Sequence, residues 1–347
     1  MWQNPDEGLE RLPPFSKDVD DEAFLHALNK ALASVPLPPL AYQADPWALP
    51  IIYIVGAPRS GTTLLSQLLS RCLEVGYINN VIARFWMRPR IGIRLSRILL
   101  GPDGREKIAL QSVHGTTKEL AGPHEFGYFW RHWLRLDESP THRLSPQALA
   151  RIDGDGLREI LEREILAGFG TPVVLKNVIC GLQAAFLSGI HRSSLFVHIR
   201  REPYAAAASV LECRRERYGN YSAWWSLKPS TYPEISALAN PAVQVAAQIL
   251  DSVGELEQEL ARPGVNSLTL PYEQLCADPG KALVQVRRAC EEMGYAVAQC
   301  GEPPRNLVVA PRHHLPAKLD QDLRIALARH DDATIARSDM KANHESH

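Results

Sequence analysis

Residues 51–69 read IIYIVGAPRSGTTLLSQLL. The apolar, β-branched run at 51–55 predicts a strand that is buried on both faces, as in a parallel sheet. A short loop bounded by Gly56 and Gly61 follows, and from Thr62 onwards apolar side chains recur at helical spacing. A strand, a glycine loop and a helix in that order open a βαβ unit. This stretch therefore predicts an α/β fold.

The same alternation returns in the second half of the chain. Apolar runs at 172–176, 194–200 and 267–270 predict three further strands, and helical patterns at 204–217 and 279–293 follow two of them. Strands that alternate with helices are typical of a parallel sheet. The predicted fold class is therefore α/β, with a central parallel sheet flanked by helices.

Three parts are predicted along the chain. Residues 1–48 form an extended, proline-punctuated N-terminal strap, residues 49–315 the main domain, and residues 316–347 a C-terminal helix with a loose tail. Residues at about 79–150 break the strand–helix rhythm, because they are aromatic, basic and rich in His and Trp. We expect them to form a helical, aromatic insertion around the functional site.

Two helices are expected in the flanking parts. The strap has apolar residues at helical spacing near 22–33, and Asp20 or Asp21 is the expected N-cap. The second helix is predicted at 323–335.

Composition excludes several classes of protein. The 38 Lys and Arg residues balance 39 Asp and Glu residues, which argues against nucleic acid as the main partner. The sequence contains no run of about 18 apolar residues, so it predicts no membrane span. Its first residues do not resemble a signal peptide. None of the six cysteines form a CxxC pair. Buried, reduced thiols and a cytoplasmic enzyme are therefore expected.

The loop between Gly56 and Gly61 has the outline of a phosphate-binding loop. Its glycines let the backbone N–H groups face an anion, and the start of the following helix adds positive potential. A nucleoside-triphosphate loop would carry Lys where Thr62 stands, and here the cation is Arg59 instead. The loop is therefore suited to an anion but poorly suited to ATP with magnesium. The alternative is an incidental turn between strand and helix.

The segment PRSGTTLL after a hydrophobic strand resembles the 5′-phosphosulfate loop of sulfotransferases, which use 3′-phosphoadenosine 5′-phosphosulfate (PAPS). The resemblance implies a P-loop nucleotide-hydrolase-like fold of the sulfotransferase type. It also implies that the loop residues bind the phosphosulfate, namely Arg59, Ser60, Gly61, Thr62 and Thr63.

Two later motifs extend the resemblance. Arg201 and Ser209, eight residues apart, match the pair that holds the 3′-phosphate in the family, and an Arg fork with a hydroxyl suits phosphate. The alternatives are a surface salt bridge for Arg201 and an ordinary helix residue for Ser209. The segment PYEQL with Asp278-Pro279 behind it is similar to a late family signature. In that signature the tyrosine, here Tyr272, lines the adenosine pocket, and the alternative is a half-buried structural tyrosine.

Lys176 ends a predicted strand, where ligands sit in parallel α/β sheets. Family members often carry a lysine at a comparable strand end, which implies that Lys176 contacts the bridging or sulfuryl oxygens. The alternative is a solvent-exposed lysine. Side-chain cations and hydroxyls can neutralise the transferred group, so no metal is expected.

A general base is harder to assign. Relatives with the PRSGTT form carry a glutamate where this chain has Asn79-Asn80, and neither amide can act as a base. We favour Glu125 or His124, with His114 third. The alternative is a helix-capping Glu beside an ordinary His. His198 lies in a predicted buried strand and is expected to be a core residue.

Two features could concern the acceptor. The aromatic residues Phe126, Tyr128, Phe129, Trp130 and Trp133 could stack on a ring, although a core role is favoured at this spacing. The basic stretch at 84–97 could attract an anionic or membrane-surface acceptor. A solvated helix face is the default interpretation of that stretch.

The predicted activity is transfer of a sulfuryl group from PAPS to an acceptor hydroxyl, with 3′-phosphoadenosine 5′-phosphate (PAP) as the product. The acceptor is expected to be a carbohydrate, a lipid or a small alcohol, and a peptide also remains open. One alternative is an atypical P-loop kinase, which should need magnesium and ignore a 3′-phosphate. The other is a nucleotide-binding module that no longer catalyses, which only the missing glutamate supports. The sequence does not indicate an oligomeric state.

Overall fold

The computed structural model describes residues 11–13, 15–38, 47–110, 115, 117–309 and 314–329. Five strands form one parallel sheet in the order β2-β3-β1-β4-β5. They are β1 (Ile51–Val55), β2 (Gly76–Tyr77), β3 (Val173–Lys176), β4 (Ser194–Arg200) and β5 (Asn266–Pro271). The predicted α/β class is confirmed, and four of the five strands lie where the sequence places them. The short β2 was not predicted, since two residues carry no periodicity.

Strand β1 runs through the middle of the sheet, and all five of its residues are buried. Its partners are aligned, with Ile51 opposite both Val173 of β3 and Ser194 of β4. Because all strands are parallel, the carboxyl ends of β1, β3 and β4 meet at one edge. That edge carries the Gly56–Gly61 loop, Lys176 and Arg201.

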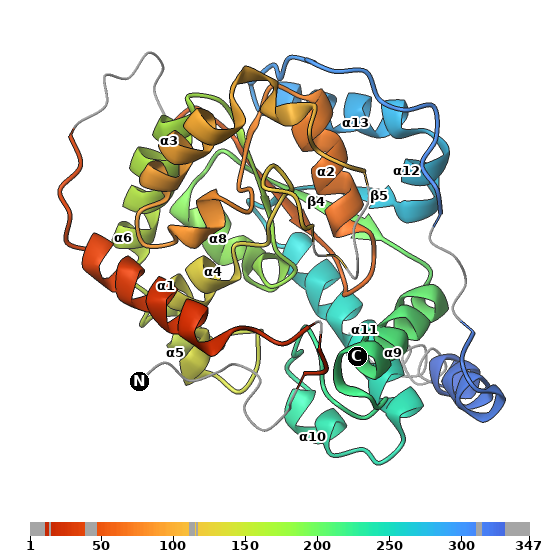
Figure 1. The fold of residues 1–347 in the computed structure, drawn as a ribbon. Coiled ribbons are helices and arrows are strands. Elements are labelled where there is room, and N and C mark those ends of the chain that lie inside the picture. The colour runs from red at the N-terminus through yellow and green to blue at the C-terminus, as the bar shows by residue number, and fades with distance from the viewer. Residues whose placement is uncertain are drawn as a thin grey trace, which may run out of the picture.

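The side chains of β1 alternate between two cores. Ile52 and Ile54 pack in a cluster with α2 (Thr62–Cys72), α12 (Tyr272–Ala277) and α13 (Pro279–Glu292). Ile51, Tyr53 and Val55 pack in the other, larger cluster. The helices that contribute to it are α4 (Gly127–Trp133), α6 (Gly154–Glu159) and α8 (Ala184–Ile190), with the π-helical η4 (Ile160–Leu166). The sheet thus lies between two layers of helices (Figure 1).

A third cluster lies beside the sheet. It joins α9 (Pro203–Tyr218) and α11 (Pro241–Leu260) with Leu323, which is fully buried. Residues 317–329 are helical, so the predicted C-terminal helix begins earlier than 323, and residues beyond 329 lie outside the described part.

One helix of the predicted strap and several helices of the predicted insertion lie among the described residues around the sheet. Helix α1 (Val19–Leu32) is capped by Asp18, whose carboxylate accepts hydrogen bonds from the backbone N–H groups of Asp20 and Asp21. The prediction that Asp20 or Asp21 is the cap is wrong, because the helix starts earlier and both residues lie in its first turn. There they still favour the positive end of the helix dipole.

The predicted insertion contains α3 (Pro89–Leu100), α4 and several short helices. Phe126, Phe129 and Trp130 are buried in the larger core, while Tyr128 and Trp133 pack against it. The expected core role is therefore confirmed for Phe126, Phe129 and Trp130, while Tyr128 and Trp133 are only partly buried. The remaining short helices are η1 (Ile82–Arg84), η2 (Pro102–Arg105), η3 (Leu136–Glu138), α5 (Pro146–Leu149), α7 (Ala167–Phe169), η5 (Cys180–Gln183) and α10 (Tyr232–Ser236). Within the described ranges, the helices are too short or too polar to cross a bilayer.

Candidate active site

The Gly56–Gly61 loop connects β1 to the start of α2. Gly61 is the N-cap of α2 with φ 104°, and Arg59 also has a positive φ of 66°. No side chain of the described residues caps the first backbone N–H groups of α2. Unpaired N–H groups at a helix start favour an anion. The loop geometry therefore fits the phosphate-binding outline.

Position 61 needs glycine because the Tyr272 ring lies close to its backbone. A Cβ atom at this position would lie 2.4 Å from the Tyr272 ring. Tyr272 is 4% exposed, and the Arg201 guanidinium stacks over its ring at 4.6 Å. The late Tyr272 motif and Arg201 therefore meet at the loop.

Arg201 and Ser209 both contact Arg59. The Arg201 Nη1 donates to the Arg59 carbonyl oxygen at 2.9 Å, and the Arg59 Nε donates to the Ser209 Oγ at 2.9 Å. Ser209 is 1% exposed, so it is not an ordinary surface residue of α9. The fold thus brings together the two residues that the spacing singled out.

Two polar atoms near the loop lack partners. The Arg201 Nε and the Ser60 Oγ are buried and make no hydrogen bond within the described residues. Burial lowers the pKa of Arg201 from its usual value, with nearby Tyr272 opposing the shift. Buried polar atoms without partners are costly, and an anionic ligand between Arg201 and Ser60 would satisfy them.

Lys176 connects this loop to the insertion. Its side chain is 1% exposed, and its ammonium Nζ lies 2.6 Å from the Glu125 Oε1. The same Nζ donates to the Thr63 Oγ1 at 2.9 Å. Lys176 is therefore not the exposed lysine of the alternative interpretation.

Unlike Lys176, Glu125 is partly exposed to solvent, with 49% of its side chain accessible. Burial would raise the pKa of the Glu125 carboxyl, but the charge and hydrogen bond of Lys176 outweigh it and lower the pKa below its usual value. Glu125 does not cap α4, whose N-cap is Phe126. The helix-capping alternative is therefore wrong.

Asn177 holds the backbone at Glu125, and the sequence reasoning missed it. Its Nδ2 donates to the Glu125 carbonyl oxygen at 3.0 Å, and its Oδ1 accepts from the Ile179 N–H at 2.8 Å. Asn177 follows Lys176 directly, so its place at a strand end was the available signal. Phe126, the residue after Glu125, has a positive φ of 56°, which turns the chain at this point.

His124 is neutral near pH 7. Its Nδ1 accepts the Phe126 backbone N–H at 2.9 Å. Burial, the largest cause, lowers the pKa of His124 to about 4, and Lys176 adds to the effect. His198 is buried in β4, as expected. His114 lies outside the described residues.

Asn79 and Asn80 have structural roles. Asn79 is buried, its Nδ2 donates to Ser96 Oγ at 2.7 Å, and its Oδ1 accepts the N–H groups of Val81 and Ile82. The Asn80 amide donates to the Thr117 and Glu119 carbonyl oxygens. These amides hold the start of the insertion in place.

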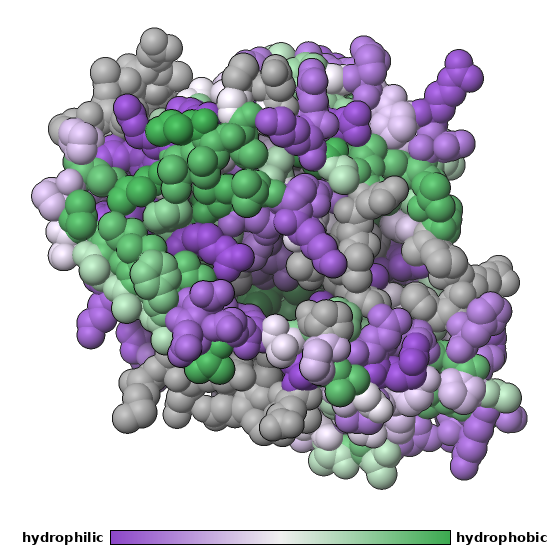
Figure 2. All heavy atoms as spheres, in the orientation of Figure 1, coloured by the Kyte–Doolittle hydropathy of each residue, from purple (hydrophilic) through white to green (hydrophobic). Residues whose placement is uncertain are grey.

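A large cleft lies beside Glu125. Its volume is about 1210 Å³, and His124 and Glu125 lie in its wall. Figure 2 shows this face of the molecule hollowed near its centre. Side chains from the strap, from the insertion and from the segment before α10 form the other walls, among them Phe24, Arg84, Trp86, Tyr128, Trp224, Trp225 and Lys228.

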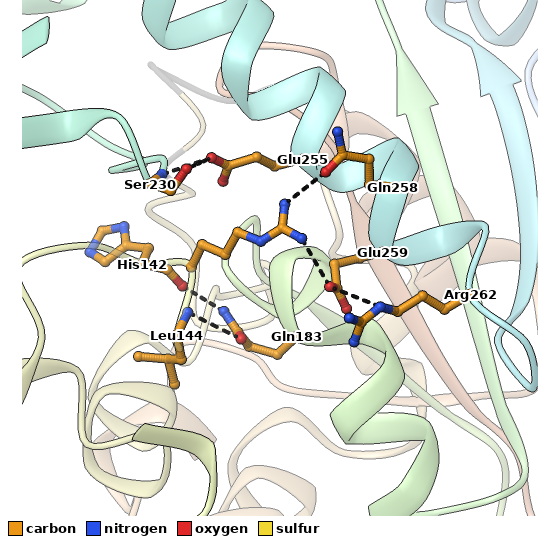
Figure 3. Close-up of polar contacts among 9 residues, drawn as sticks. His142, Leu144, Gln183, Ser230, Glu255, Gln258, Glu259 and Arg262 are labelled. Atoms are coloured by element: carbon orange, nitrogen blue, oxygen red, sulfur yellow. Dashed lines mark hydrogen bonds and ion pairs between the residues drawn. The ribbon is translucent and has the colours of Figure 1, made fainter. Parts of the chain in front are cut away.

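Hydrogen bonds from η5 and α11 hold the cleft wall near His142 and Lys228 in place (Figure 3). The His142 Nδ1 accepts the Lys228 N–H at 3.0 Å, and the His142 carbonyl oxygen accepts from the Gln183 Nε2 at 2.5 Å. Glu255 of α11 accepts the Ser230 N–H at 2.8 Å. Burial lowers the pKa of His142 to about 3, so the His142 side chain is uncharged near pH 7.

The described residues contain no group of three or more His, Cys, Asp or Glu side chains that could hold a metal ion. The cations and hydroxyls at the sheet edge suit an anionic nucleotide. Glu125, in the wall of the cleft, suits proton transfer.

Residues 50–297 match the family model described as the sulfotransferase family. No curated protein matches the chain. Among solved structures, sulfotransferase STF9 from Mycobacterium avium is 16% identical with a TM-score of 0.47, over 94% of this chain and 79% of that one. Sulfotransferase STF1 from Mycobacterium tuberculosis H37Rv is 16% identical with a TM-score of 0.44, over 81% and 71%.

Proposed function

The chain belongs to the sulfotransferase family, and from this premise we propose that it transfers a sulfuryl group from PAPS to an acceptor hydroxyl. We further propose that the acceptor enters the cleft that ends at Glu125. All six cysteines lie in the described residues and form no disulfide there; five are buried and Cys300 is exposed. Reduced thiols support the cytoplasmic location that we propose for the enzyme.

One observation carries the proposal. The Lys176 ammonium contacts Thr63 of the phosphate loop on one side and the Glu125 carboxylate on the other. The loop is suited to the sulfuryl donor, and the cleft beyond Glu125 is large enough for an acceptor. Donor and acceptor sites would therefore meet at this ion pair.

The residues around the loop fit the donor. We propose that Arg59, Ser60, Gly61, Thr62 and Thr63 hold the 5′-phosphosulfate. Arg201 and Ser209 would hold the 3′-phosphate, and the Tyr272 ring would border the adenosine. The unpartnered Arg201 Nε and Ser60 Oγ support this assignment, because a bound phosphate group would supply their missing partners.

Bound PAPS supplies an activated sulfuryl group. Glu125 accepts the proton of the acceptor hydroxyl as its oxygen bonds to sulfur. The bond between sulfur and the bridging phosphate oxygen breaks in the same displacement, and the electron pair leaves with PAP. Lys176, Arg59 and the N–H groups at the start of α2 stabilise the negative charge that moves to the leaving phosphate. His124 lines the same cleft, and its Nδ1 accepts the Phe126 N–H, which supports a role as a neutral donor through Nε2.

The nucleotide assignment is tested by calorimetric titration with PAP and with ADP, each with and without magnesium. We expect tight PAP binding that does not depend on magnesium, and weak ADP binding. Arg201→Ala should weaken PAP binding by about 1.5–3 kcal/mol, the scale of a charge-assisted hydrogen bond. The matched control is Arg200→Ala, because the neighbouring Arg200 side chain is 60% exposed and pairs with Glu257. Equal PAP affinity in both variants would refute the 3′-phosphate site.

The catalytic assignment is tested with Glu125→Gln. Its turnover should fall by about 10²–10⁴, the usual contribution of a general base, while PAP affinity changes little. Magnesium-dependent preference for ADP would favour a kinase instead. Tight PAP binding without turnover of any acceptor, and no effect of Glu125→Gln, would favour a binding module.

A further inference from the structure

Helix α3 presents an apolar surface to solvent. Ile98 is 71% and Leu99 55% exposed. Leu95, one turn earlier, and Ile91, two turns earlier, are partly exposed. Figure 2 shows hydrophobic side chains gathered over α3, on the same face as the central hollow. A contiguous exposed apolar patch, unlike single scattered apolar residues, is a common mark of an interaction surface.

Arginines surround this apolar surface. Arg94 and Arg97 are exposed and Arg90 is partly exposed, and α3 contains no acidic residue. Arg90 donates to the Pro38 carbonyl oxygen, and Arg97 donates to that of Phe169, so neither charge is neutralised there. Arg94 has no polar partner within the described residues. Among the described residues, the face therefore combines apolar side chains with arginines that form no ion pair.

The helix is held firmly beside the cleft. Its buried side packs so closely that a Cβ on Gly92 would lie 2.9 Å from the Ile82 Cα, and Ile82 begins η1. The next residues of η1, Ala83 and Arg84, line the cleft. The exposed face of α3 thus has a fixed position next to the cleft wall.

We propose that the exposed face of α3 docks on an anionic lipid bilayer, with Ile98 and Leu99 entering the interface and Arg90, Arg94 and Arg97 contacting lipid phosphates. A helix with apolar and arginine side chains lying in the membrane plane is the usual form of such binding. The acidic first turn of α1, with Asp20 and Asp21, would repel an anionic bilayer, but it does not lie next to α3. The opposite, C-terminal end of α1 adjoins the segment before α3, where Asn29 donates to the Arg84 carbonyl oxygen.

A second copy of the chain fits this face less well. A twofold contact is made by the same surface on both subunits. Such a contact through α3 would bring arginines against arginines without acidic partners. Lipid phosphates provide the complementary charge.

The proposal is tested by sedimentation of the full chain with vesicles. Phosphatidylcholine vesicles are compared with phosphatidylcholine vesicles that contain phosphatidylglycerol. We expect binding to the anionic vesicles only, weakened by high salt. Ile98→Asp with Leu99→Asp, and separately Arg94→Glu, should each weaken it by about tenfold or more. These side chains are exposed, so the variants should fold.

The matched control is Val243→Asp on α11, because Val243 is also exposed, at 39%, and α11 contains no Lys or Arg. It should bind vesicles as the unaltered chain does. Unchanged vesicle binding in the α3 variants, or no binding at all, would overturn the proposal. A dimer in analytical ultracentrifugation that the double variant dissociates, without vesicle binding, would assign the face to a second copy. This measurement needs neither donor nor turnover, so it is independent of the proposed enzymatic function.

Discussion

At the scale of residues, the site depends on the two contacts that the Lys176 ammonium makes. Lys176 Nζ contacts both Glu125 and Thr63, and its side chain is buried. A buried charge is stable only with such partners. A ligand phosphate in the loop would add a further partner for Lys176, which would loosen its hold on Glu125 and make the carboxylate more basic.

The pH dependence of turnover should reflect this ion pair. The pKa of the Glu125 carboxyl lies below its usual value of 4.5, because the Lys176 charge outweighs the effect of burial. The base form is therefore present above that pKa and is lost as the pH falls through it. We expect kcat/KM to stay flat through pH 6.5, where an ordinary histidine base would titrate, and to fall only in the acid range.

The control for this prediction is His124→Asn. Asparagine can accept the Phe126 N–H that His124 Nδ1 accepts, so the local fold should be kept. We expect its activity plateau to fall much less than that of Glu125→Gln. A loss of activity centred near pH 6.5 in the unaltered chain would contradict Glu125 as the base.

At the scale of elements, the start of α2 depends on Gly61. It combines a φ of 104° with the contact to the Tyr272 ring, so any side chain would both strain the backbone and push α12 away. The loop and the first turn of α12 are thus coupled through this one glycine.

Gly61→Ala should therefore lower the free energy of unfolding by about 1–3 kcal/mol and weaken PAP binding. Gly254→Ala is the control, because Gly254 lies within α11 with nothing near its Cβ position. It should raise the free energy of unfolding by about 0.5–1 kcal/mol. Urea unfolding measures both. Equal effects of the two substitutions would show that the Tyr272 contact does not constrain the loop.

At the scale of the whole molecule, the end of the described chain completes a core. Leu323 packs among α9 and α11 in the cluster that also contains Ala57 of the phosphate loop. The Tyr204 hydroxyl donates to Asp320, and Asn240 Nδ2 donates to Asp322 at 3.0 Å. The helix at 317–329 therefore supports α9, which carries Ser209.

Leu323→Ala should lower the free energy of unfolding by about 2–5 kcal/mol, the usual cost of truncating a buried leucine. Ile325→Ala is the control, because Ile325 is 42% exposed, and should cost less than about 1 kcal/mol. Urea unfolding again distinguishes them. A cost as small for Leu323 as for Ile325 would mean that this helix is not part of the folding core.

The sequence by itself determined the α/β class, four of the five strands and the loop at Gly56–Gly61. These features depend on side chains that are neighbours along the chain, so their spacing records the structure directly. The pair Arg201 and Ser209 was singled out through the resemblance to a family motif, and its role at a 3′-phosphate stays a prediction.

Only the tertiary structure decided which of the two described candidate bases, Glu125 and His124, pairs with Lys176 beside the loop. Glu125 meets Lys176 because the carboxyl end of β3 and the turn before α4 pack together, and no local pattern records a contact across 51 positions. The same holds for Asn79 and Asn80. Their amides look like vacant base positions in the sequence, but they are hydrogen-bonding supports of the insertion. Long-range packing fixes such contacts through burial and charge, and neither is visible until distant segments are brought side by side.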